Sequence, residues 1–232
     1  MNAATRSRIE LLASYCGPGY VVIVLLGFWA VAGFVPPPSP STDIQLIAGV
    51  FRSDYTRIRI GMLLVMWSAV IFLPFAALIS RLLARIEGSF GVLSGTALLG
   101  GAGNMVLTFY PAIWWLAAAY RPDRPPELVY AFNDWAWLQF IGGVSIYDAL
   151  PLSVAVAAFC DASAKPVFPR WAGYFNLLVV ALIVPDQLLF FFHGGPFAWS
   201  GLFGFWIPLV AFSSWFFVNF AFLRNAILRE RC

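Results

Sequence analysis

Charged residues are scarce in this sequence of 232 residues. Only 11% are Asp, Glu, Lys or Arg, whereas 61% are hydrophobic. Soluble domains carry about one quarter charged residues. The composition therefore excludes an ordinary soluble domain and predicts an integral membrane protein.

The residues that usually bind metals or form covalent cofactor links are also few. The chain has one histidine, His193, and one lysine, Lys165. A single histidine excludes bis-histidine haem ligation and a histidine-rich diiron site. Lys165 falls in a predicted loop before Pro166, which excludes a Schiff base inside the bundle and a Walker A sequence. We expect neither a metal nor a cofactor.

Cysteine is rare as well. The three cysteines are Cys16, Cys160 and Cys232. In the topology derived below, they lie at cytoplasmic helix ends or in the C-terminal tail, where thiols stay reduced. We expect no disulfide.

Long apolar runs are the dominant feature that is present. Six of them are long enough to cross a bilayer. They predict transmembrane helices at about 16–35, 60–80, 90–118, 130–159, 171–192 and 197–223. Little sequence is left for anything else, so we expect an all-α bundle forming a single integral-membrane domain over residues 1–232. Residues 1–15 are expected to form a short interfacial helix before the first span.

One loop has a helical pattern of its own. Ile44, Ile47, Phe51 and Tyr55 recur at spacings near three and four residues, which predicts an amphipathic helix over about 42–56. Ser41 or Thr42 is the expected cap. This helix would lie on the outer face, either as a lid or as a connector bound to the membrane interface.

The basic residues predict an orientation. With the N-terminus inside, nine of the fourteen Lys and Arg residues fall on the cytoplasmic side and five outside. This bias places both termini in the cytoplasm of a multi-pass cell-membrane protein, as in a bacterial inner membrane. The expected partners are membrane lipids and, as alternatives, other membrane proteins or further copies of this chain. Nucleic-acid binding is not expected, because the basic residues follow the membrane orientation.

Acids inside the spans are the main candidates for chemistry. Asp148 and Asp186 fall within predicted spans, where a carboxylate is costly and a protonated acid is favoured. Either is a candidate catalytic acid, and the alternative is a structural hydrogen-bond anchor. The nearby Pro151 and Pro185 are expected to leave the carbonyl groups of Tyr147 and Ala181 without helical partners.

A ligand pocket is predicted from the aromatic and polar residues. Eight of the ten tryptophans fall in the outer halves of the predicted helices, more unevenly than an ordinary aromatic belt. A pocket open toward the outer half is one explanation, and a thick belt or a partner surface is the other. The candidate ligand-binding residues are Asn104, Trp114, Trp115, Asp134, Trp137, Tyr147, Gln187, His193 and Trp199.

Two patterns have alternative readings. The glycines near Gly100 and Gly103 favour close helix packing, or alternatively leave room for a flat ligand. Asp134 and Asp148 are 14 residues apart, which on a continuous helix puts them on one face about 21 Å apart. Asp134 is then an interfacial carboxylate rather than the partner of Asp148.

Three functions remain open at this point. The first is binding or handling of a sterol-, terpenoid- or quinone-like lipid in an intramembrane pocket. The second is an acid-catalysed lipid isomerase or cyclase that uses Asp186 or Asp148, with Tyr147 or His193 relaying the proton. The third is an accessory subunit of a larger membrane complex.

Overall fold

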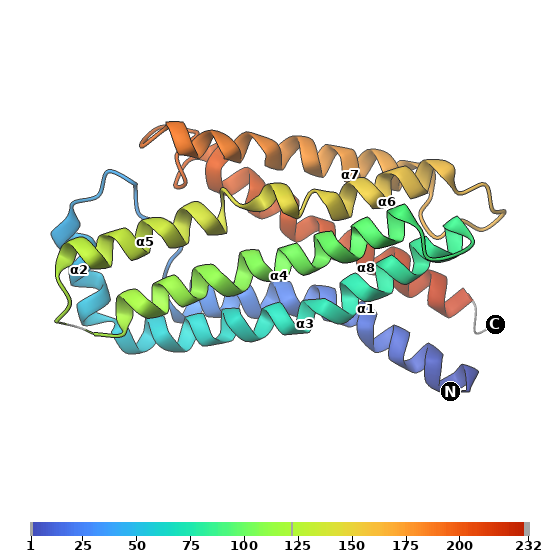
Figure 1. The fold of residues 1–232 in the computed structure, drawn as a ribbon, viewed down its shortest axis with the longest axis horizontal. Coiled ribbons are helices and arrows are strands. Elements are labelled where there is room, and N and C mark those ends of the chain that lie inside the picture. Colours follow the sequence, from blue (N-terminus) through green and yellow to red (C-terminus); the bar gives the residue numbers. More distant parts are fainter. Residues whose placement is uncertain (1, 122, 230–232) are drawn as a thin grey trace.

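The computed structural model describes residues 2–121 and 123–229, and these residues form helices and connecting loops without a β-strand. Six helical segments are long and apolar enough to cross a membrane. They run alternately in opposite directions, so both termini lie at the same end of the bundle (Figure 1). The predicted all-α bundle of six spans is confirmed.

Several spans are interrupted rather than continuous. The first consists of α1 (Ala3–Leu25) and the π-helical η1 (Leu26–Val31), and α2 (Ile44–Ser53) follows in the loop. The second and third spans are α3 (Tyr55–Glu87) and α4 (Val92–Ala119). The fourth span is divided into α5 (Pro126–Phe140), the 3₁₀-helical η2 (Val144–Ile146) and α6 (Ala149–Cys160). The last two are α7 (Arg170–Ile183) with the 3₁₀-helical η3 (Val184–Phe191), and the π-helical η4 (Leu202–Trp206) with α8 (Ile207–Arg229).

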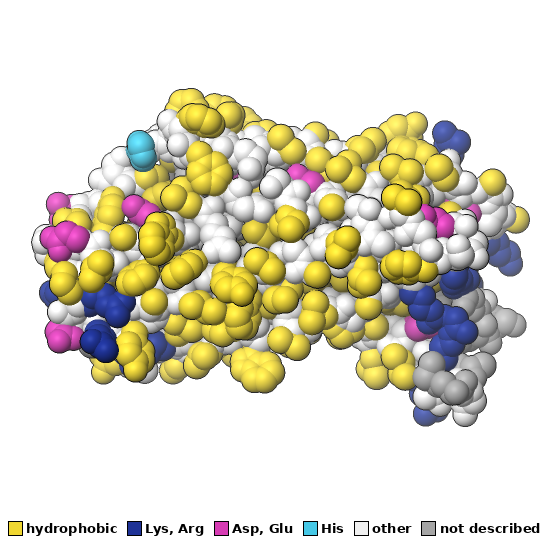
Figure 2. Space-filling view, viewed as in Figure 1, with side chains coloured by type: hydrophobic (Ala, Val, Ile, Leu, Met, Phe, Trp, Pro, Cys, Tyr) yellow, Lys and Arg dark blue, Asp and Glu magenta, His cyan; other side chains and the backbone are white. Residues whose placement is uncertain are grey.

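The charge distribution agrees with a membrane-spanning bundle. In Figure 2 hydrophobic side chains cover the middle of the visible face, and Lys and Arg gather at its two ends. A lipid-facing surface needs this pattern, because a charged side chain in hydrocarbon is costly.

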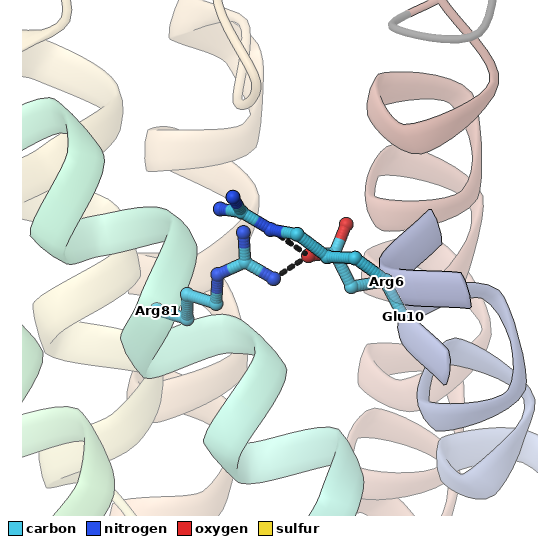
Figure 3. A network of polar contacts seen from close by, with 3 residues as sticks. All are labelled: Arg6, Glu10 and Arg81. Carbon is cyan, nitrogen blue, oxygen red and sulfur yellow. Dashed lines mark hydrogen bonds and ion pairs between the residues drawn. The ribbon is translucent and has the colours of Figure 1, made fainter. Parts of the chain in front are cut away.

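The first helix begins earlier than predicted. It starts at Ala3, and the side chain of Asn2 caps it by accepting a hydrogen bond of 2.8 Å from the N–H of Thr5. The predicted N-terminal helix is thus present but continuous with the first span, and its position at the membrane interface stays a prediction. Glu10 explains the difference, because this buried carboxylate pairs with Arg6 on its own helix and with Arg81 on α3 (Figure 3). A buried carboxylate needs such partners, and they fix the N-terminal turns of α1 against the bundle.

The predicted loop helix is present but shorter. It is α2, and its cap is Asp43, whose carboxylate accepts from the N–H of Gln45 at 2.8 Å, rather than Ser41 or Thr42. Ile47 and Phe51 are buried, as the amphipathic pattern predicts. Tyr55 belongs instead to α3, because the chain turns at Asp54.

Glycines let the helices approach closely. A Cβ atom on Gly101 would lie 2.4 Å from the Cβ of Ala76 on α3, and one on Gly100 would lie 2.9 Å from the backbone nitrogen of Leu150 on α6. A Cβ on Gly103 would meet the side chain of Ile146 at 2.5 Å. Neighbouring helices therefore occupy the space beside these glycines of α4. Of the two alternatives given above, close helix packing applies, and no room is left there for a flat ligand.

The interior is divided into two apolar clusters along the bundle. The first contains Phe72, Phe75, Trp215 and Phe216, and we call it the lower core. The second contains Phe28, Phe34, Trp115, Trp137 and Trp199, and we call it the upper core. The candidate site lies where these two cores meet.

Labelling of Cys160 tests the predicted orientation of the bundle. This exposed thiol ends α6, at the same end as both termini (Figure 1). In a chain in which Cys16 and Cys232 are replaced by serine, a membrane-permeant maleimide should label Cys160 in intact cells and an impermeant one should not. Cys232 itself lies outside the described residues.

The opposite end provides the control. Ser53→Cys, at the exposed end of α2, should react with the impermeant reagent in a chain that lacks the other cysteines. Reversed reactivity of the two positions would place the termini outside.

Candidate functional site

A half-open cavity of about 90 Å³ lies between α1, α4, the α5–η2 break, the α7–η3 junction, η4 and the start of α8. Its walls include residues of both cores, such as Leu107 and Ile183 of the lower core and Ile141 and Phe205 of the upper core. The cavity therefore lies in the middle of the bundle. Most of its lining is apolar, and its polar members are Tyr20, Asn104, Thr108, Asp186 and Ser213.

Irregular backbone surrounds this cavity for identifiable reasons. Helix α5 ends before the pair Gly142-Gly143, and α7 ends just before Pro185, which has no N–H to donate. At membrane depth such backbone is tolerated only where protein partners or a cavity satisfy it. The carbonyl of Gly142 has such a partner, because the side chain of Gln187 donates to it at 2.8 Å.

Asp186 is the acid that reaches the cavity. Its side chain is fully buried, at 0% exposure. One carboxyl oxygen, Oδ1, accepts from Nε2 of Gln187 at 2.9 Å, and the other, Oδ2, has no partner. Gln187 thus holds the carboxyl group in place through its bond to Gly142, while one oxygen stays available to a ligand.

Asn104 offers a second unpartnered group. It is 1% exposed, lines the cavity from α4, and its Nδ2 has no hydrogen-bond partner. Beside it, the hydroxyl of Tyr20 lies 2.7 Å from that of Thr108, which donates to the Asn104 carbonyl at 3.1 Å. Because Thr108 uses its proton there, the hydroxyl of Tyr20 is the donor to Thr108. Nδ2 of Asn104 lies near the Tyr20 hydroxyl but makes no hydrogen bond of good geometry with it.

Asp148 and Tyr147 lie behind the cavity rather than in its wall. Both are buried, and Oδ1 of Asp148 and the hydroxyl of Tyr147 have no partner. Asp148 is within electrostatic range of Asp186. The Tyr147 carbonyl accepts from the N–H of Leu150 at 2.9 Å, so the prediction that Pro151 leaves it unpartnered is wrong. The same expectation for Ala181 stays a prediction.

Three of the candidate tryptophans pack inside the upper core. Trp115 donates to Asn133 at 3.3 Å, and Trp199 donates to the carbonyl of Pro38 at 2.8 Å. The ring of Trp137 stacks on that of Trp199 with centroids 6.4 Å apart and planes at 11°. None of the three lines the cavity. They fill the interior above it.

Trp114 lies at a different place. Its Nε1 donates to Gln139 at 2.8 Å, and both residues line a shallow hollow of about 340 Å³ with Trp135 and Phe190. Trp135 and Phe190 are exposed, so the hollow is open on the side of the bundle that would face lipid. Gly143 lines this hollow, and Leu107 lines the central cavity. The two residues are close neighbours, because a Cβ atom added to Gly143 would lie 2.5 Å from the side chain of Leu107.

Asp134 and His193 are not brought to the cavity. Asp134 is half-buried and within electrostatic range of His193, which is exposed in the turn after η3. The carbonyl of His193 accepts from the hydroxyl of Ser41 at 2.9 Å. The predicted single helix carrying Asp134 and Asp148 is interrupted between α5 and α6, so their expected 21 Å offset on one face no longer applies.

Sequence reasoning missed most of the wall of the cavity. Tyr20, Phe140, Phe205, Phe212 and Ser213 line it and were not singled out. Only Thr108 carries a usable signal, because it lies one helical turn after Asn104 and so shares its face.

Comparisons of the chain with protein-family models, with curated proteins and with solved structures found no match. The functional argument therefore rests on the cavity and its polar groups.

Proposed function

We propose that this protein binds a hydrophobic small molecule whose polar end enters the central cavity. The observation that carries the proposal is the presence of two buried, unpartnered polar atoms, Oδ2 of Asp186 and Nδ2 of Asn104, in an otherwise apolar cavity. Buried polar groups in proteins nearly always have partners. A bound molecule with a polar end would supply them.

The size of the cavity limits what part of the ligand it holds. Its volume is about 90 Å³, and an apolar cavity of about 150 Å³ accommodates benzene. A sterol-, terpenoid- or quinone-like molecule would therefore place only its polar end inside. The half-buried lining residues Val24 and Leu25 on α1 and Leu209 on α8 mark the side along which the apolar body would extend.

The bundle should retain such a molecule during gentle purification. We expect native mass spectrometry of the protein from lipid nanodiscs to show a bound hydrophobic species, and extraction to find it enriched over its share of the host membrane. Recovery of bulk phospholipid alone, in the proportions of the host membrane, would contradict the proposal.

Acid catalysis is a second candidate, supported by the same free oxygen of Asp186. A protonated Asp186 would be placed to give a proton to an alkene, epoxide or enone in the cavity. Asp148 would act only through Asp186, because it does not line the cavity. If the protein is an acid catalyst, incubation with a substrate should yield a chemically altered product.

A further inference from the structure

We propose that the polar end of the ligand is a protonated amine, and that Asp186 is its counter-ion. This inference rests on the proposed function and names the chemical class of the ligand. It depends on three features of the cavity: an acid whose hydrogen-bond partner is a neutral amide, a wall rich in aromatic rings, and a second polar side chain, Asn104.

The ion pairs found among residues 2–121 and 123–229 leave out the acid of the cavity, Asp186. The ion pairs of Arg6 and Arg81 with Glu10 and of Arg57 with Asp54 involve neither Asp186 nor Asp148. The side chain that contacts Asp186 by a hydrogen bond is the neutral amide of Gln187. A second acid, Asp148, lies within electrostatic range. A buried acid must either stay protonated or have a counter-charge, and a cationic ligand would supply the counter-charge.

The wall of the cavity suits a cation. The aromatic residues Tyr20, Phe140, Phe205 and Phe212 line it, coming from α1, α5, η4 and α8. The rings of Tyr20 and Phe212 lie with their centroids 6.2 Å apart. The face of an aromatic ring attracts a cation, and the attraction is stronger away from water. A neutral apolar end would gain only contact area from the same rings.

The polar lining adds a second point of recognition. Nδ2 of Asn104 is a donor without an acceptor. An ammonium group has no acceptor to offer, but an oxygen elsewhere in the same molecule does. The ligand class that satisfies both Asp186 and Asn104 is a lipophilic amine that also carries a hydroxyl or carbonyl oxygen.

Two probes with the same apolar chain test the charge directly. Dodecylamine and 1-dodecanol are titrated into the full chain in nanodiscs of neutral phosphatidylcholine, and bound ligand is counted by native mass spectrometry against empty nanodiscs. We expect the amine to bind at least about tenfold more tightly than the alcohol, as a charge-assisted hydrogen bond would give. Asp186→Asn should remove this preference and leave binding of the alcohol within about twofold.

Asp134→Asn is the matched control, because it makes the same change at another acid with an unpartnered oxygen that does not line the cavity. It should keep the preference for the amine. Equal binding of both probes to the unaltered protein would overturn the amine inference and leave the proposed function standing. Binding of neither probe, together with no retained molecule after purification, would overturn both. The comparison on the unaltered protein decides the matter even if Asp186→Asn does not fold.

Discussion

Gly61→Ala should strongly destabilise the bundle. Gly61 on α3 crosses Gly27 of η1 at backbone contact, and an added Cβ would lie 2.4 Å from the Gly27 carbonyl oxygen and 2.7 Å from the Cβ of Ala32. Neither atom is the end of a flexible side chain, so the two helices must separate. Overpacking of this kind costs about 1–3 kcal/mol, occasionally more. The measurement is the melting temperature of the protein in detergent, followed by size-exclusion chromatography after heating.

Gly19→Ala is the matched control. Gly19 is also in the interior of a long helix, α1, but a Cβ there would meet nothing within 4 Å. Alanine is a better helix former than glycine by about 1 kcal/mol, so this change should be neutral or stabilising. Equal melting temperatures for the two variants would contradict the close crossing of η1 and α3.

Ser213→Trp should abolish retention of the hydrophobic molecule while the bundle still folds. Ser213 is a half-buried residue of α8 in the wall of the cavity, and an indole there would occupy most of the roughly 90 Å³. We expect at least about a tenfold loss of bound species, because the ligand and the indole exclude each other from a closely packed interior. Native mass spectrometry of the purified variant measures the loss.

Val210→Trp provides the comparison for this change. Val210 lies three residues earlier on α8 but is 68% exposed, so its side chain points away from the cavity. A tryptophan there should leave retention unchanged. If both variants lose the molecule, the cavity is not where it binds.

The number and positions of the spans were predictable because length and hydropathy alone set them. Segments of about 20 apolar residues must cross the bilayer, whatever their neighbours. The ends were less predictable. Helix α1 begins at Ala3, and Glu10 in its N-terminal part pairs with Arg81 on another helix. A pairing between distant segments is not visible in a window of sequence.

The break in the fourth span at Gly142-Gly143 was not predicted, although its residues are visible in the sequence. The fourth span was expected as a continuous helix over 130–159, whereas it unwinds at Gly142-Gly143. Glycine is tolerated within many membrane helices. The deciding factor is tertiary, because Gln187 of η3 binds the carbonyl that the break exposes.

The candidate site was predicted in part. Asp186 and Asn104 were named from sequence, and both line the cavity. The buried tryptophans were assigned to a pocket, but Trp115, Trp137 and Trp199 pack in the upper core. The position of a residue along a span gives the depth of its side chain in the membrane. The direction of the side chain turns by about 100° with each residue, so depth alone does not say which neighbours the side chain faces.

The bond between Gln187 and Gly142 has a mechanical consequence for how a ligand would enter. It joins the α5–η2 break to η3, so these two irregular segments should move as one unit. Two π-helical segments adjoin the helices of the cavity wall: Leu26–Val31 follows α1, and Leu202–Trp206 precedes α8 and packs against η3. A π-helical turn has i→i+5 hydrogen bonds in place of the α-helical i→i+4 bonds, and such turns are frequent at functional sites. Because η4 packs against η3 and carries Phe205 in the cavity wall, we expect any rearrangement of η4 on ligand entry to reach the segment that holds Asp186.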